Sequence, residues 1–180
     1  MHAAALDPTI ASRLMLAALP VETAMNQDFE PTRLVRAYRQ HIRARAEEVF
    51  PLLCPEREKD WLPGWDATML YSVSGVAEPQ AVFATPQPGA APVVWTVVEQ
   101  RPNERVRFVR WHPDEMVVDL EIELAPDGAR ATRVDVRYTY TATTADGARR
   151  IARMTEAQWQ EQMRRWEDCM NAWLARPAAR

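Results

Sequence analysis

The stretch that decides the fold is residues 154–174, MTEAQWQEQMRRWEDCMNAWL. Its large apolar side chains recur at intervals of four, three, four and three residues, and they are Trp159, Met163, Trp166, Met170 and Trp173. This spacing places them on one face of an α-helix, with charged and amide side chains over much of the remaining surface. No proline occurs from Asp146 to Ala175, and Pro177 ends the pattern. The sequence therefore predicts one long helix over about residues 146–175.

The segment before this helix alternates with the two-residue period of β-strands. Residues 116–124, MVVDLEIEL, alternate apolar with acidic side chains, and residues 131–142, ATRVDVRYTYTA, alternate valine and tyrosine with polar side chains. Strands of this kind form an antiparallel sheet with one face in water. Five more runs have strand-like composition: 33–44, 68–73, 80–85, 93–100 and 105–112. The sequence predicts a curved antiparallel sheet of six or seven strands, joined mostly by short turns.

Two short helices are predicted after the first strand. Glu47 and Glu48 precede an apolar run, and acidic residues favour the first turn of a helix, where the dipole is positive. Pro51 keeps this helix short or kinked, because proline fits only the first turn. Pro55 then suits the first position of a second helix, which the Pro-Gly pair at 63–64 ends.

This order of elements predicts an α+β domain whose sheet wraps around the C-terminal helix. A sheet with one apolar face must cover that face, and the C-terminal helix is the only large element available. A twisted sheet of six or seven strands curls, so a single helix cannot fill its concave side. We expect space between helix and sheet, near the short helices, and such a space is a natural site for a small molecule.

The bulk properties narrow the classes of partner. The chain has 180 residues, a formal net charge of -3 and a pI near 5.7. The length suits one domain with a short extension, and the charge does not favour a nucleic-acid partner. No segment approaches the roughly 20 apolar residues of a membrane span. Seven tryptophans indicate either a Trp-rich core or a pocket lined with indoles. The sequence does not decide whether the chain forms a homodimer.

Residues 1–30 have no clear period and are interpreted as an N-terminal extension, either disordered or containing a short helix. The two cysteines, Cys54 and Cys169, do not suggest a disulfide framework. We interpret both as reduced thiols of a cytoplasmic protein. A bridge between them requires the helix and the loop to meet, which the sequence does not settle.

Several segments resemble the START-like superfamily, also called SRPBCC, which includes polyketide cyclases, Bet v 1-type proteins and the Hsp90-activator-like family. The segments are HIRARAEEVFPLLCPEREKDWLPGW (41–65), TMLYSVSGVAE (68–78), AVFAT (81–85), TRVDVRYTYTA (132–142) and the 154–174 helix. The resemblance implies the helix-grip fold over a domain of residues 31–177. It looks most like bacterial members of unassigned role. It is specific for the fold and not for the function, since members include lipid carriers, cyclases and chaperone cofactors.

The candidate ligand-binding residues are aromatic, sulfur-containing or cationic side chains on faces expected to meet the cavity. They are Trp61, Trp65, Trp95, Phe108, Arg110, Tyr138, Tyr140, Trp159, Met163 and Trp166. Indoles and methionines suit irregular apolar ligands, and the same residues are also expected in a packed core. For any single residue of the helix, packing is the simpler interpretation, and in this fold both roles coexist.

The orientation of the polar candidates is open at this point. Arg110 faces the cavity if its strand turns Phe108 inward, and it lies on the surface if Trp111 points inward instead. Either Arg57 or Glu58 contacts a polar group of a ligand at the mouth of the cavity, or the two form a solvated surface pair.

No metal site, cofactor or catalytic residue is predicted. The histidines are His2, His41 and His112, and none has a partner at the spacing of metal ligands. Rieske-type oxygenases share the fold that the resemblance implies, but their iron-binding motif is absent here. Cys54 has no histidine partner that would activate a thiol nucleophile.

Three hypotheses follow. The first is binding of a hydrophobic small molecule, lipid-like or aromatic, in an apolar cavity of a few hundred cubic ångströms. The second is a polyketide cyclase or dehydratase-like enzyme, which adds converging acid or base groups such as Tyr138, Tyr140, Arg110 or Glu58. The third is a protein-interaction domain like the Hsp90 activators, which predicts a filled interior and an exposed apolar patch.

Overall fold

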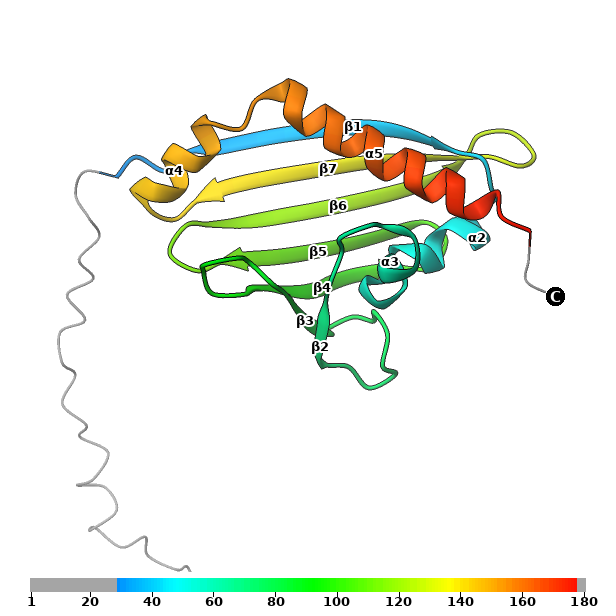
Figure 1. The fold of residues 1–180 in the computed structure, drawn as a ribbon, viewed down its shortest axis with the longest axis horizontal. Coiled ribbons are helices and arrows are strands. Elements are labelled where there is room, and N and C mark those ends of the chain that lie inside the picture. Colours follow the sequence, from blue (N-terminus) through cyan, green and yellow to red (C-terminus); the bar gives the residue numbers. More distant parts are fainter. Residues whose placement is uncertain (1–28, 178–180) are drawn as a thin grey trace, which may run out of the picture.

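The computed structural model describes residues 29–177, so most of the predicted N-terminal extension lies outside the described residues. The described part forms one seven-stranded antiparallel sheet in the order β1-β7-β6-β5-β4-β3-β2 (Figure 1). The strands are β1 (Arg33–Ile42), β2 (Thr68–Tyr71), β3 (Val82–Thr85), β4 (Val93–Arg101), β5 (Arg105–His112), β6 (Met116–Pro126) and β7 (Thr132–Ala142). From β2 to β7 each strand pairs with the next in sequence, which confirms the predicted meander.

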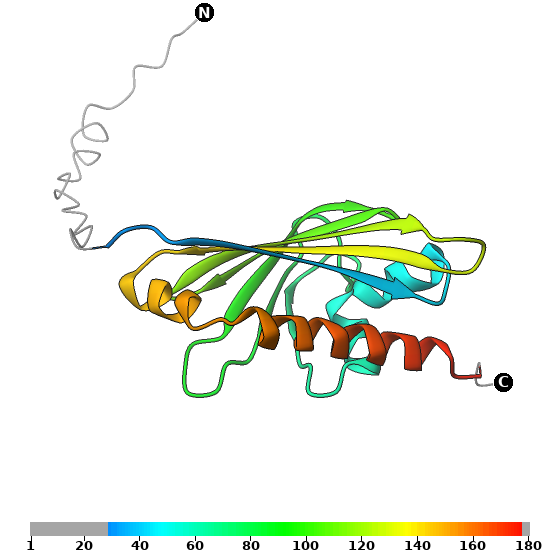
Figure 2. The ribbon, with the colours of Figure 1, turned by 90° about the horizontal axis from the view of Figure 1, so that it is seen from above.

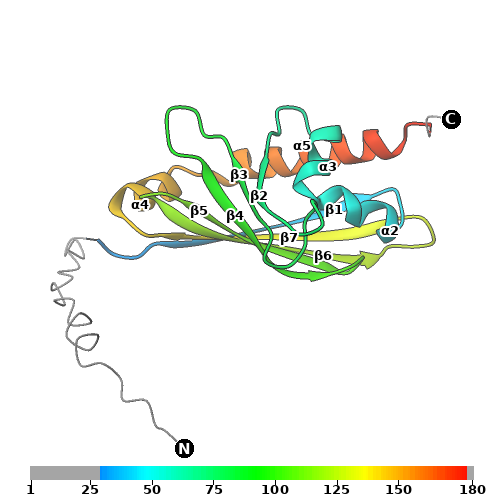
Figure 3. The same ribbon diagram turned by 90° about the horizontal axis from the view of Figure 1, so that it is seen from below.

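The helices lie on one side of this sheet, as Figures 2 and 3 show from two directions. They are α2 (Ala46–Val49), the 3-10 turn η1 (Phe50–Leu53), α3 (Pro55–Trp61), α4 (Ala145–Ala152) and α5 (Glu156–Leu174). Pro55 occupies the first turn of α3, where its missing N–H costs no hydrogen bond. The long α5 and the short helices after β1 confirm the predicted α+β helix-grip architecture.

The prediction of one uninterrupted helix over 146–175 was wrong, because the chain leaves the helix between Ala152 and Glu156. Thr144 caps α4 by accepting a hydrogen bond from the N–H of Gly147, and Thr155 caps α5 by accepting one from the N–H of Gln158. Threonine hydroxyls compete in this way with helix continuation. The absence of proline therefore did not guarantee a continuous helix.

The α4–α5 junction and the middle of α5 are bound to β1 by polar side chains of its inner face. The Arg36 guanidinium donates to the carbonyl of Met154 at 3.2 Å and pairs with Glu156 at 2.7 Å. The Gln40 amide, which is 1% exposed, donates to the carbonyl of Met163 at 3.2 Å. These bonds explain why two polar residues share a face with apolar ones on β1.

The two faces of the sheet differ as the alternation predicted. On β6 the even-numbered residues from Met116 to Leu124 are buried. Asp119 and Glu121 face outward and pair with Arg107 and Arg105 of β5, respectively. Strand β4 has a register irregularity between Val97 and Glu99. A bulge of this kind bends its strand.

Candidate ligand pocket

A pocket of about 220 Å³ lies between the inner face of the sheet, α3 and α5. Its floor consists of side chains from five neighbouring strands, β3 to β7, and its sides come from η1, α3, the segment after α3, and α5. The exposed residues Pro63, Gln162 and Arg165 stand at its rim. This is the position predicted from the inability of one helix to fill a curled sheet.

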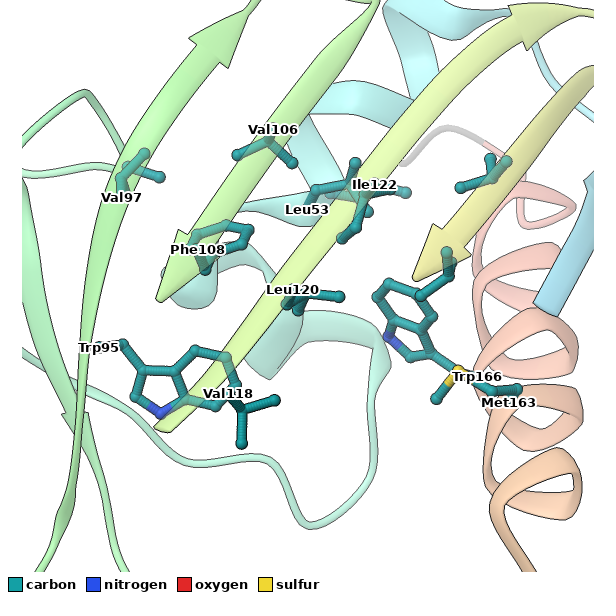
Figure 4. Packing of buried hydrophobic residues seen from close by; sticks show 14 of the residues in the cluster. Leu53, Trp95, Val97, Val106, Phe108, Val118, Leu120, Ile122, Met163 and Trp166 are labelled. Atoms are coloured by element: carbon teal, nitrogen blue, oxygen red, sulfur yellow. The ribbon is translucent and has the colours of Figure 1, made fainter. Parts of the chain in front are cut away.

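The walls of the pocket are largely aromatic and aliphatic. Figure 4 shows Trp166 of α5 extending toward Leu120 and Ile122 of β6, with Trp95 and Phe108 on the neighbouring strands. Trp95 packs against Phe108 edge to face, with ring centroids 6.3 Å apart. Phe83 of β3 stacks on Trp95 at 5.4 Å and completes the aromatic wall.

The pocket brings together most of the candidate residues. Those that line it are Trp65, Trp95, Phe108, Arg110, Tyr138, Met163 and Trp166. Trp61, Tyr140 and Trp159 do not line it. Trp61 packs on Trp166 at 5.8 Å and donates its indole N–H to the carbonyl of Leu52. Trp159 packs edge to face on Tyr138 at 6.1 Å, and Tyr140 stacks on the same phenol at 5.7 Å.

Trp65 reaches the pocket because the chain reverses after α3. Gly64 has φ of 84°, in the left-handed region that side chains disfavour. The reversal lets the Trp65 N–H bond to the carbonyl of Leu62 and lets the indole N–H donate to the carbonyl of Pro55 at 2.9 Å. Leu62, Pro63 and Trp65 thus form one side of the pocket.

Arg110 faces inward, which settles the orientation that the sequence left open. Phe108 is 4% exposed and Trp111 is 50% exposed, so the even-numbered residues of β5 point toward the helices. The Arg110 guanidinium carbon lies 4.8 Å from the centroid of the Trp95 ring and 5.5 Å from that of Tyr138. The two rings hold the cation by cation–π attraction.

Glu58 also faces inward, so the surface pair with Arg57 does not form. Arg57 pairs instead with Asp60 at 2.8 Å, on the outer side of α3. The Glu58 side chain lines the pocket and is 9% exposed, and burial raises its pKa well above the ordinary value of 4.5. Burial favours the neutral form of a carboxyl group, which donates a hydrogen bond as well as accepting one.

Two further titratable groups near Arg110 are Tyr138 and His112, and burial favours the neutral form of each. Burial raises the pKa of the Tyr138 phenol, although the positive charge of Arg110 acts in the opposite direction. Burial lowers the pKa of His112 to about 4, and the charges of Arg110 and Arg150 lower it further. Arg110 is therefore the cation that sets the electrostatic potential at the inner end of the pocket.

No protein-family model matches the sequence, and a comparison with curated proteins gives no match. Solved structures do match. Truncated norcoclaurine synthase from Thalictrum flavum superposes with a TM-score of 0.62 at 11% identity, over 83% of this chain and 98% of the other. The same enzyme in complex with dopamine and hydroxybenzaldehyde gives 0.61 at 11% identity, over 83% and 91%. The chain has a Bet v 1-like fold.

A bacterial structure shares this Bet v 1-like fold as well. A protein from Arthrobacter aurescens, solved by NMR in solution, superposes with a TM-score of 0.55 at 18% identity, over 81% of this chain and 88% of the other. Identities this low establish the fold and nothing finer. The fold confirms the resemblance predicted from the sequence, and the roles of the pocket residues stay predictions.

Several residues that line the pocket were not among the candidates predicted from the sequence. They are Leu53, Pro55, Leu62, Phe83, Leu120, Ile122, Gln162 and Arg165. Leu120 and Ile122 were recognised as facing the core, but no signal separated pocket wall from packed interior. Phe83 lies on the four-residue strand β3, which is too short to show a period.

An exposed apolar cluster lies at the edge of the sheet, on β2 and the turn after it. Leu70 is 58% exposed, Tyr71 60%, Val73 84% and Val76 46%. The interaction hypothesis predicts such a patch, but it also predicts a filled interior, whereas the space beneath α3 is hollow. Among residues 29–177, no helix is long and apolar enough to cross a membrane.

Proposed function

We propose that the protein binds a small aromatic molecule in the pocket between the sheet, α3 and α5. The observation that carries this proposal is the convergence of Trp65, Trp95, Phe108 and Trp166 on one unfilled space. Aromatic side chains offer flat apolar surfaces that match planar ligands. Such a convergence of indoles around a void has no packing benefit, since voids forgo contacts that a filled core makes.

The size of the pocket favours a compact ligand over a lipid-like one. Its volume of about 220 Å³ is below the ~300–1,000 Å³ typical of small-molecule sites. One or two rings with short substituents suit this space, and long acyl chains do not. The complex of norcoclaurine synthase with dopamine and hydroxybenzaldehyde, in a protein of the same fold, supports the same choice.

The test uses binding of prodan, a neutral two-ring naphthalene dye, by the full chain, together with native mass spectrometry of freshly purified protein for a retained small molecule. We expect dye binding that Leu120→Trp weakens at least about tenfold, a change of ~1.4 kcal/mol, because the indole fills the pocket. Val117→Trp is the matched control, since Val117 lies on the outer face of the same strand and pairs with Trp111. Gln162→Trp, at the exposed rim, blocks the opening without entering the core.

The proposal fails if the wild-type protein neither binds the dye nor retains a small molecule. It also fails if the two blocking variants bind the dye as well as the Val117→Trp control does. Melting temperatures of all variants establish that each is folded before affinities are compared.

A second candidate is a cyclase- or dehydratase-like enzyme acting in the same pocket. The specific observation is that Glu58, Arg110 and Tyr138 line one space, since a neutral carboxyl and a phenol are potential proton donors. This candidate predicts that the wild type converts a bound substrate into product. It also predicts that Glu58→Gln abolishes this turnover but still binds the dye. Binding without turnover by the wild type leaves the first candidate standing alone.

A further inference from the structure

The Arg110 guanidinium is the unusual feature of the pocket, because it is a partly buried cation without an anion. Its Nε atom is buried and has no hydrogen-bond partner among the described residues. No ion pair joins it to a carboxylate in residues 29–177, although sixteen pairings of arginine, lysine or histidine with a carboxylate form elsewhere in that part of the chain. Rings of Trp95 and Tyr138 enclose it on two sides.

The acidic residues near Arg110 do not neutralise its positive charge. Glu58 lines the same pocket, but it makes no ion pair with Arg110, and its burial favours the protonated form. Glu115, in the turn that follows β5, pairs with Arg150. Removing a charge from water is costly unless a partner of opposite charge or several hydrogen bonds replace the solvent. The cation–π contacts compensate only in part.

We infer that the ligand is an aromatic acid whose carboxylate, or an equivalent anionic oxygen group, binds the Arg110 guanidinium while its ring lies against Trp95, Phe108 and Trp166. This inference rests on the proposed function, since it names the ligand class for the same pocket. A guanidinium presents a planar fork of donors that matches a carboxylate. The aromatic walls supply the apolar contacts and leave the charge at Arg110 as the determinant of specificity.

Glu58 adds a second element of recognition. A neutral carboxyl donates a hydrogen bond to a hydroxyl, carbonyl or carboxylate oxygen of the ligand and does not repel an anion. An ionised Glu58 would repel the same anion across the pocket. Apart from Arg165 at its exposed rim, the pocket therefore pairs one cation with one neutral donor, which is the arrangement that an acid with a short polar substituent fits.

The test compares two probes of nearly the same shape, 2-naphthoate and 2-naphthamide, by isothermal titration of the full chain. We expect the wild type to bind the anion at least about tenfold more tightly, because hydrogen bonds to charged groups are about twice as strong as neutral ones. Arg110→Gln removes this preference, so the affinities of the variant for the two probes agree within about threefold, the scatter of ordinary substitutions. Arg110→Lys retains the charge and keeps part of the preference.

Arg137→Gln is the matched control, since Arg137 is exposed and lies on the outer face of β7. It removes the same charge without touching the pocket, and the preference for the anion stays as in the wild type. Equal affinity of the wild type for the two probes overturns the inference, as does a preference that survives in Arg110→Gln. If prodan binds the wild type in these cases, the proposed function stands and only the ligand class is wrong. If neither probe nor dye binds the wild type, both fail together.

Discussion

The two ends of the inner face of the sheet are built from the same kinds of residue and yet one is filled and the other hollow. At the β1–β7 end, α5 lies close to the sheet, and Trp159 packs edge to face on Tyr38 at 6.3 Å and on Tyr138 at 6.1 Å. At the β3–β5 end, Trp95 and Phe108 face a pocket instead. The difference shows that aromatic content does not decide between core and site.

Whether an aromatic side chain is packed or lines the pocket depends on the distance between α5 and the sheet. Polar bonds from Arg36 and Gln40 hold the start and middle of α5 against β1, so indoles fill the narrow gap there. Farther across, the bulged strand β4 curls and α3 forms a separate wall. The same tryptophan side chain therefore stabilises the fold at one end and is available to a ligand at the other.

The largest expected effect is on Trp159, at the filled end. Trp159→Ala should lower the free energy of unfolding by about 3–5 kcal/mol, as aromatic truncations in a packed core do. The matched variant is Trp65→Ala at the pocket opening, where the indole is only partly buried. This variant should lose less stability than Trp159→Ala and should weaken prodan binding more. Urea unfolding and dye titration measure both, and equal losses of stability would contradict the distinction between the two ends.

A smaller effect concerns His112, which is 7% exposed and has no partner for either ring nitrogen among the described residues. The groups facing it are Arg110, Arg150 and Glu115, whose carboxylate is 3.9 Å away. Its pKa falls from 6.5 to about 4, so the unfolded chain binds a proton in this window and the folded chain does not. Stability is therefore lost as the pH falls from 6.5 toward 4.

His112→Leu should flatten this part of the pH profile, removing a loss of about 2 kcal/mol between pH 6.5 and 4. Thermal or urea unfolding across this range is the measurement. An unchanged slope in the variant would mean that other groups cause the loss.

The smallest effect is expected at the hollow end, for Glu58. Its folded-state pKa lies above 4.5, so its contribution to stability is present below that pH and is lost as the pH rises through the raised value. Glu58→Gln should match the wild type near pH 4 and exceed it at pH 8 by more than the ~0.5 kcal/mol of an ordinary surface change. A stability difference independent of pH would show that the carboxyl is ionised in the fold.

The sequence predicted the fold well because the decisive signals are local periods. The alternation of 116–124 and 131–142 and the stripe of α5 survive unchanged in the structure. The helix break at Arg153 to Thr155 was missed, because a threonine cap competes with helix continuation without any proline to mark it.

The candidate site was less predictable because it depends on spacing between elements. Arg110 could be placed only once the burial of Phe108 and the exposure of Trp111 were known. Glu58 occupies a seven-residue helix among charged neighbours, and no pattern in that segment separates the one buried carboxyl from the exposed ones. The sequence predicts which residues share a face of a strand, but it does not predict how much space lies between that face and the helices.

The indoles at the pocket give the protein a built-in optical reporter. Trp65, Trp95 and Trp166 line the space, whereas Trp111 lies half exposed on the opposite face of the sheet. A bound aromatic compound that absorbs near the emission of tryptophan would quench the first three by energy transfer and affect Trp111 less. Occupancy can therefore be followed by intrinsic fluorescence in unlabelled protein, with Trp111→Phe lowering the background.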